Sequence, residues 1–142
     1  MDGDTSTSRI AIHGPEDFAG MRAAGRVAAE TLDMITPHVR AGVSTGELDR
    51  IIHEYTLGRG ATPATLGYRG YPKSSCISLN HVVCHGIPGE RRLQDGDILN
   101  IDITSVVDGW YGDSSRMFTV GPVSRKAAVL IDVTYDALMR GL

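Results

Sequence analysis

Asp108-Gly109 joins two β-prone segments of the sequence and fixes how they can pair. Asp-Gly is a preferred pair in two-residue type I′ turns, because both central residues of such a turn need a positive φ. The stretch 96–121 is therefore predicted to form an antiparallel β-hairpin. In this register Val107 lies opposite Trp110, and Asp102 lies opposite Ser115.

The pairing also predicts which side chains share a face, because side chains alternate along a strand and residues directly opposite lie on the same side. One face of the hairpin is expected to be polar and the other to belong to a core. The polar face carries Asn100, Asp102, Thr104, Tyr111, Asp113 and Ser115. The core face carries Leu99, Ile101, Ile103, Val107, Trp110, Phe118 and Val120.

Asp102 and Asp113 become diagonal neighbours on the polar face, with Cα atoms roughly 7–8 Å apart. Two carboxylates that approach one point repel each other, and a cation between them relieves that repulsion. A pair of divalent metals about 3.5–4 Å apart would fit the gap. The alternative is that both are solvated surface charges. A β-bulge in either strand would also separate the two acids onto opposite faces.

Composition limits the class of protein. The chain has 142 residues, 42% of them hydrophobic, which is enough for one globular domain with a core. Its 14 basic and 17 acidic residues give a net charge of −3, so nothing indicates a nucleic-acid partner. There are two cysteines and no apolar run long enough to span a bilayer. We expect a cytoplasmic protein with no membrane partner.

Two amphipathic helices are expected before the hairpin. Apolar residues at helical spacing follow Pro15, which suits a first helical turn, and Pro37 ends the pattern. Ser44 and Glu47 form a capping-box pattern for a second helix, which is expected to end at 58–60, where glycines occur.

The remaining segments complete the predicted organisation. Residues 1–12 are expected to be a flexible polar tail. Residues 61–88 indicate short strands and loops, including a strand or strand pair that begins at Ile77. Ser124 is a candidate cap for a third helix after the hairpin, with apolar residues on one side.

Several motifs closely resemble type I methionine aminopeptidases of the M24, or pita-bread, family. These motifs are Gly67-Tyr68, Gly70-Tyr71-Pro72-Lys73-Ser74, Cys76-Ile77-Ser78, Val83-Cys84-His85-Gly86-Ile87-Pro88, Asn100-Ile101-Asp102 and Gly112-Asp113. The resemblance implies an α+β fold: the N-terminal half of a pita-bread fold, with an antiparallel β-hairpin sheet covered by amphipathic helices. Residues 13–142 would form the first half of the catalytic domain.

The resemblance also implies roles for seven residues. Asp102 and Asp113 match ligands of two divalent metal ions, which could be cobalt, manganese, iron or zinc. His85 matches a catalytic histidine that contacts the substrate's scissile amide. The pocket for the methionine side chain would be lined by Thr65, Tyr68, Tyr71 and Cys76, with threonine standing at 65 where some relatives have cysteine.

The function implied is metal-dependent removal of the N-terminal methionine from nascent proteins and peptides, with a further partner at the ribosome exit region. The family's other metal ligands, a histidine and two glutamates, would lie beyond residue 142, so the chain alone is expected to be inactive. Two alternatives remain: a non-catalytic pita-bread module that binds proteins, and a proline-specific aminopeptidase of the same fold.

Overall fold

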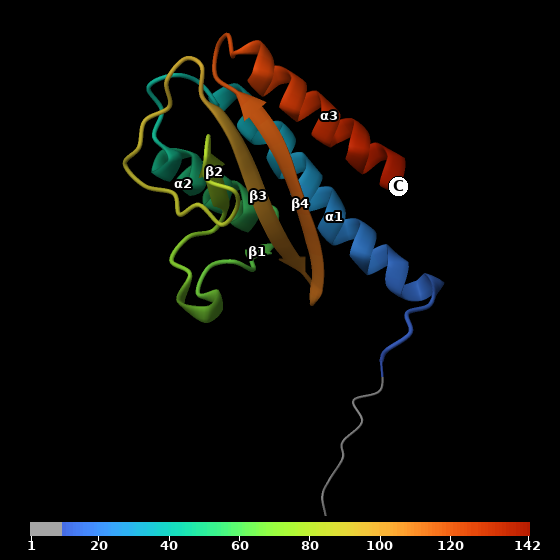
Figure 1. Ribbon diagram of the computed structural model, residues 1–142. Helices are drawn as coiled ribbons and strands as arrows, with labels where there is room; N and C mark the ends of the chain where they lie inside the picture. Colours follow the sequence, from blue (N-terminus) through green and yellow to red (C-terminus); the bar gives the residue numbers. More distant parts are fainter. Residues whose placement is uncertain (1–9) are drawn as a thin grey trace, which may run out of the picture.

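The computed structural model describes residues 10–142 (Figure 1). Its elements in chain order are α1 (Pro15–Ile35), α2 (Thr45–Gly58), β1 (Thr62–Pro63), β2 (Cys76–Leu79), β3 (Ile98–Val107), β4 (Trp110–Thr119) and α3 (Arg125–Gly141), with 3₁₀ helices at Thr36–His38 and Tyr68–Gly70. The expected tail lies mostly outside the described residues. Of its last three residues, Ile10 and Ile12 are almost fully exposed.

The hairpin of β3 and β4 has the predicted turn and register. Asp108 and Gly109 both have positive φ, 48° and 83°, as a type I′ turn requires. All ten residues of β3 pair in sequence with β4, so no bulge interrupts the ladder. Asp102 lies opposite Ser115 as predicted. Asp102 and Asp113 are therefore diagonal neighbours on one face of the hairpin, as the turn predicts.

β3 is the central strand of a four-stranded antiparallel sheet. β4 pairs along one edge of β3, while β2 and the two-residue β1 pair along the other edge, at different points of its length. Cys76 on β2 lies directly opposite Asp102, so the side chains of the two residues share a face of the sheet. The sheet thereby brings a residue of the expected pocket next to an expected metal ligand.

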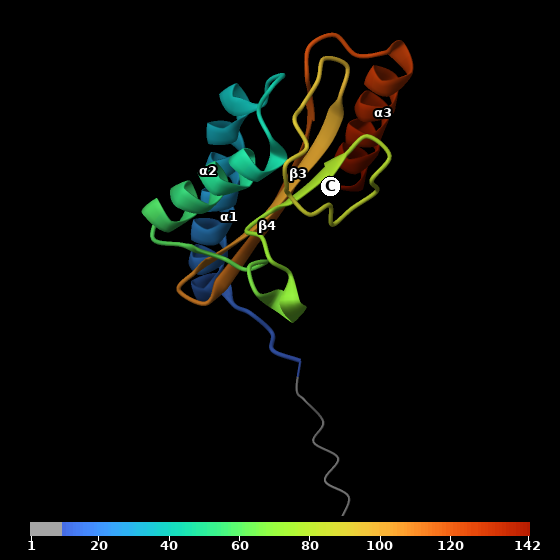
Figure 2. The same cartoon turned by 90° about the vertical axis from the view of Figure 1, so that its left-hand side faces the viewer.

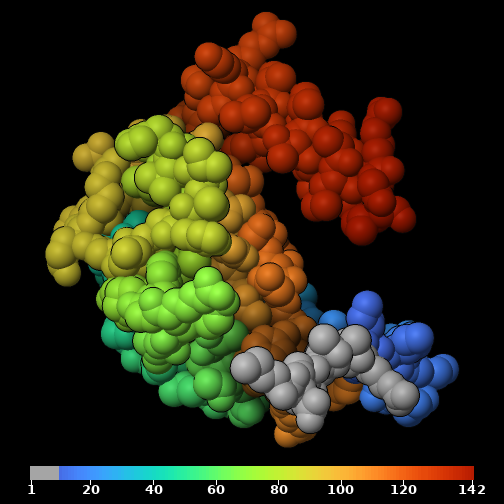
Figure 3. Space-filling model, turned by 60° about the horizontal axis from the view of Figure 1, so that its bottom comes forward, coloured from blue at the N-terminus to red at the C-terminus, as the bar shows by residue number. Residues whose placement is uncertain are grey.

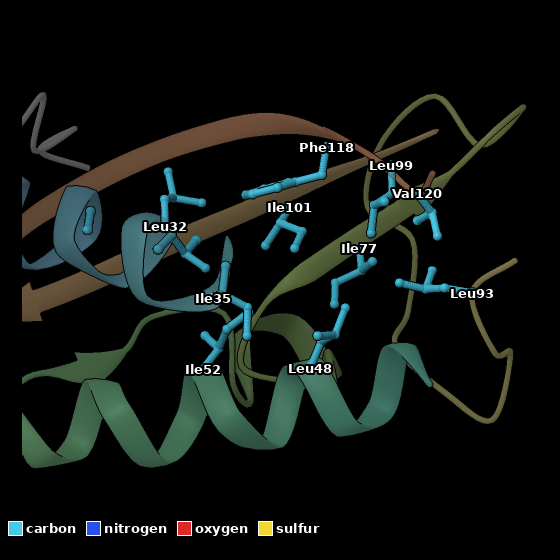
Figure 4. Close-up of a cluster of buried hydrophobic side chains, with 12 residues drawn as sticks. Leu32, Ile35, Leu48, Ile52, Ile77, Leu93, Leu99, Ile101, Phe118 and Val120 are labelled. Atoms are coloured by element: carbon cyan, nitrogen blue, oxygen red, sulfur yellow. The ribbon is translucent and has the colours of Figure 1, made fainter. Parts of the chain in front are cut away.

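α1 and α2 cover one face of the sheet, and the core lies between them and the strands (Figures 2 and 4). The apolar face predicted for the hairpin supplies much of this core. Of that face, Val107 and Trp110 are only partly buried, because they flank the turn. The buried cluster consists of Ala28, Leu32, Ile35, Leu48, Ile52, Ile77, Leu93, Leu99, Ile101, Ile103, Phe118 and Val120.

The first two helices begin and end close to the predicted residues. α1 has Pro15 in its first turn and ends at Ile35, where a 3₁₀ helix that contains Pro37 takes over. The Ser44 side chain accepts a hydrogen bond from the Glu47 N–H at 3.1 Å and caps α2. Local capping chemistry was sufficient to locate both helices. No helix within residues 10–142 has the length and apolar character needed to cross a membrane.

The segment expected to form a strand or strand pair from Ile77 contains one strand, which is shorter than expected. β2 is the only part of 77–89 that forms a strand, and the chain then turns at Asn80, whose φ is 51°. The chain returns so that the Gly86 carbonyl accepts a hydrogen bond from the Ile77 N–H at 2.9 Å. The loop thus contacts β2 through Gly86 without forming a second strand.

α3 is capped by Ser124 as expected, yet none of its residues is buried. Its predicted apolar side, which includes Tyr135 and Leu138, is largely exposed. Figure 3 shows the helix projecting away from the rest of the molecule. α3 therefore presents several exposed apolar side chains to its surroundings.

A buried carboxylate joins the loop before β3 to the turn after β2. Asp97 accepts hydrogen bonds from the Asn80 side chain at 2.9 Å and the Gln94 N–H at 2.8 Å, and it forms an ion pair with Arg91 at 3.2 Å. Two segments therefore depend on one side chain, which is itself buried.

Replacing Asp97 by alanine is expected to lower the free energy of unfolding by about 2 kcal/mol, because several charge-assisted hydrogen bonds are lost together. Urea denaturation of the purified chain measures this value. Asp95→Ala is the matched control, since Asp95 lies on the same turn and is exposed. Equal losses in the two variants would show that the Asp97 bonds are not responsible.

Candidate active site

Asp102 on β3 and Asp113 on β4 line the same cavity. They lie on one face because Asp113 pairs with Thr104, two residues along β3 from Asp102. The Thr104 hydroxyl donates a hydrogen bond to Asp113 Oδ1 at 3.0 Å, which fixes the orientation of that carboxylate. The hairpin therefore aims two acids into one space, as the sequence predicted.

The surroundings of Asp102 disfavour its charged form. Burial raises the pKa of the Asp102 carboxyl, the negative charge of Asp113 raises it further, and nearby His85 partly offsets the rise. Burial and the neighbouring carboxylate therefore both act against the charged form of Asp102.

The donor atoms at this point suit a divalent cation. Carboxylate oxygens are ligands for such ions, and a cation between Asp102 and Asp113 would remove the repulsion that raises the Asp102 pKa. Within residues 10–142, no group of three or more His, Cys, Asp or Glu side chains converges as metal ligands would. The described residues thus offer part of a metal site.

All seven residues predicted for the site line one cavity of about 740 Å³. The acids and His85 are accompanied by the four residues expected in the methionine pocket. The seven residues are Thr65, Tyr68, Tyr71, Cys76, His85, Asp102 and Asp113. Residues from five separate segments of the chain thus meet in one place, although their individual roles stay predictions.

Tyr71 and Cys76 form the inner wall of the pocket. Burial raises the pKa of the Cys76 thiol, so the sulfur stays neutral near neutral pH. Burial also raises the pKa of the Tyr71 phenol, with further contributions from Cys76 and Asp49. Tyr71 donates to the carbonyls of Ser75 and Gly86, at 3.0 and 2.9 Å. The wall is therefore uncharged, as an apolar thioether side chain would require.

The other two pocket residues differ in their surroundings. Tyr68 is well exposed at the mouth of the cavity, where the Arg69 guanidinium lies over its ring. The Thr65 hydroxyl is buried and has no hydrogen-bond partner among the described residues. A buried hydroxyl without a partner destabilises the fold, and a cysteine at this position would place a weaker hydrogen-bonding group there.

Sequence reasoning assigned no role to Asp49, which supports this pocket from α2. One carboxylate oxygen, Oδ1, accepts bonds from the backbone N–H groups of Ser74 and Ser75 and from the Ser75 hydroxyl, at 2.8 to 3.0 Å. The ring of His53, also on α2, lies with its Nδ1 2.8 Å from the Ser74 hydroxyl. One feature of the sequence could have identified Asp49: it is an acidic residue beside Leu48, within the apolar stripe of the helix.

The raised pKa of Asp102 predicts how the stability of the metal-free chain depends on pH. The folded state binds the Asp102 proton more tightly than the unfolded chain does, so stability falls as pH rises from the ordinary carboxyl range through the raised pKa. Asp102→Asn removes this loss. In EDTA, urea unfolding between about pH 4 and pH 8 should show the variant gaining stability over the parent as pH rises.

Asp108→Asn is the control for this pH series. It makes the same chemical change in the same hairpin, at a turn position that accepts asparagine. Its pH dependence should equal that of the parent chain. An Asp102→Asn variant with the parental pH dependence would contradict the assignment.

Comparisons with known proteins agree with this geometry. The model of metallopeptidase family M24 matches residues 19–142. A methionine aminopeptidase from Rickettsia prowazekii is 56% identical over 94% of this chain and 51% of its own length. One from Escherichia coli K12 is 53% identical over 94% of this chain and 51% of its own. The chain thus spans about half the length of these relatives.

A solved structure supports the same conclusion. The crystal structure of methionine aminopeptidase from Rickettsia prowazekii superposes with a TM-score of 0.92 and 56% identity, covering 94% of this chain and 54% of that one. The expected fold class, the α+β N-terminal half of a pita-bread fold, is confirmed. This family implies divalent metal ions. The chain belongs to metallopeptidase family M24.

Proposed function

We propose that this chain is the part of a methionine aminopeptidase that carries two metal ligands and the pocket for methionine. The observation that carries the proposal is that Asp102 and Asp113 face one cavity together with His85 and a wall of aromatic and thiol groups. Two relatives more than half identical over 94% of the chain are named methionine aminopeptidase. We further propose residues 1–12 as a tail and 13–142 as half of the catalytic domain.

Each residue of the site has a proposed task. Asp102 and Asp113 hold two divalent metal ions, one of which they share, and these ions can be cobalt, manganese, iron or zinc. When bound, such ions lower the pKa of a bound water and polarise a carbonyl group. His85 donates a hydrogen bond at the scissile amide. The pocket then limits which side chain can precede that amide.

Methionine fits the pocket by shape and polarity. Its unbranched thioether fills irregular apolar space and makes favourable contacts with aromatic rings. Tyr68 and Tyr71 supply such rings, Cys76 supplies a neutral soft atom, and Thr65 closes the wall. The substrate we propose is the N-terminal methionine of nascent proteins and peptides. Such a substrate and two free cysteines are consistent with action in the cytoplasm.

A fusion of this chain with part of a relative, called the fused chain below, tests the proposal directly. It joins residues 10–142 to the remaining C-terminal part of the Rickettsia prowazekii relative, which is 56% identical over the shared region. Given a divalent metal and a peptide that begins with methionine, the fused chain should release free methionine. The 142-residue chain alone should release none, because two carboxylates leave a metal site incomplete.

The outcomes separate the candidate functions. Release of methionine by the fused chain supports the aminopeptidase, and release of residues that precede proline instead would support the proline-specific relative. A folded, metal-bound fused chain that releases no amino acid would contradict the proposal and favour a binding module.

A further inference from the structure

The His85 side chain reaches the cavity from a loop, and its own ring takes part in no hydrogen bond of residues 10–142. The backbone at residue 85 therefore sets the direction in which the side chain leaves the loop. That backbone is left-handed, with φ of 55°. This region is disfavoured for any residue with a Cβ, so surrounding contacts must maintain it.

The contacts that maintain it converge on the next residue, Gly86. Its carbonyl accepts from the Ile77 N–H and from the Tyr71 phenol, both at 2.9 Å, and its N–H donates to the Ser78 hydroxyl at 3.1 Å. A side chain at 86 would approach the Ile77 carbonyl oxygen to 2.3 Å, so only glycine lets the loop lie this close to β2.

Tyr71 is the contact that comes from outside the loop and β2. Its phenol proton is shared between the Gly86 carbonyl and the Ser75 carbonyl, at 2.9 and 3.0 Å. Ser75 is itself fixed, because Asp49 on α2 accepts bonds from its N–H and its hydroxyl. A continuous series of hydrogen bonds thus runs from a buried carboxylate on a helix to the residue that follows His85.

We propose that Tyr71 is a positioning residue for His85: its phenol, anchored through Ser75 to Asp49, holds the Gly86 carbonyl and so keeps His85 in the left-handed conformation that directs its imidazole into the cavity. This inference rests on the proposed function for the importance of His85, yet the geometry it describes belongs to the 142-residue chain. It gives Tyr71 a task in addition to lining the pocket.

Tyr71→Phe tests the proposal, because it removes the phenol oxygen and keeps the ring. Tyr68→Phe is the matched control, since Tyr68 lines the same cavity and its phenol makes no hydrogen bond within residues 10–142. Ile35→Val controls for general loss of stability, because it removes one methylene from the core away from the loop.

NMR on the isotope-labelled chain gives two readouts. The backbone chemical shifts and the HN–Hα coupling of His85 report its φ, and we expect Tyr71→Phe alone to move them away from left-handed values. Amide exchange at Ile77 and Gly86 should become about two- to tenfold faster, as loss of one hydrogen bond predicts. Tyr68→Phe and Ile35→Val should leave the His85 signals unchanged.

A second variant keeps the proposal testable if Tyr71→Phe unfolds the chain. Asp49→Asn weakens the anchor at Ser75 and should move the His85 signals in the same direction by a smaller amount. Unchanged His85 signals in both folded variants would overturn the proposal. Since no activity is measured, this failure is distinct from a failure of the fused chain to release methionine.

Discussion

Replacing Asp102 by asparagine in the fused chain is expected to lower the rate of methionine release by about 10³-fold or more. A metal site supplies several kcal/mol of transition-state stabilisation, and about 1.4 kcal/mol corresponds to each factor of ten in rate. Asp113→Asn should have an effect of similar size, because Asp113 is the other proposed metal ligand of the hairpin. The rates are measured with saturating metal and a peptide that begins with methionine.

Asp108→Asn in the fused chain is the control, because it changes an acid in the same hairpin without touching the cavity. It should retain the parental rate. Calorimetric titration with Mn²⁺ should show reduced metal binding in the Asp102 and Asp113 variants and normal binding in the control. Normal turnover by folded Asp102→Asn protein would exclude Asp102 as a metal ligand.

The 142-residue chain is expected to associate with itself in a concentration-dependent way through α3. Large exposed apolar patches mark surfaces that associate, and the apolar side of this helix is uncovered. Tyr135 and Leu138 on that side are 60% and 59% exposed. Burial of two such side chains contributes about 3 kcal/mol or more, so Tyr135→Lys with Leu138→Lys should weaken association at least about 100-fold.

Val129→Lys with Val133→Lys is the matched control for this variant. Both valines are exposed, at 49% and 60%, and helical geometry places them on the opposite side of α3. Sedimentation velocity over a range of concentrations measures the association. Equal weakening by both pairs would show that added charge, rather than the apolar side of α3, is responsible, and a monomeric parent chain would contradict the prediction.

The hairpin was predictable from sequence because its determinants are local. Asp108-Gly109 sets the turn, the turn sets the register, and strict alternation then places Asp102 and Asp113 on the same face. Helix starts at Pro15 and Ser44 were equally local, since a proline in the first turn or a capping hydroxyl acts within a few residues.

The loop that carries His85 could not be predicted in the same way. Its left-handed residues and its return onto β2 depend on the bond that the Gly86 N–H donates to the Ser78 hydroxyl and on the bond that the Gly86 carbonyl accepts from Tyr71, which no local pattern specifies. Strand propensity alone therefore predicted a longer strand or a pair there. The support from Asp49 was missed because its partners lie 25 and 26 residues away.

The sequence by itself determined where the two acids lie, because backbone geometry over a few residues forces them together whatever the rest of the chain does. Only the tertiary structure decided that the segment from Thr65 to His85 closes over those acids as one cavity. It also decided that no residue of α3 is buried within residues 10–142. Both outcomes depend on contacts between distant segments, where packing and hydrogen bonding across the fold override local preference.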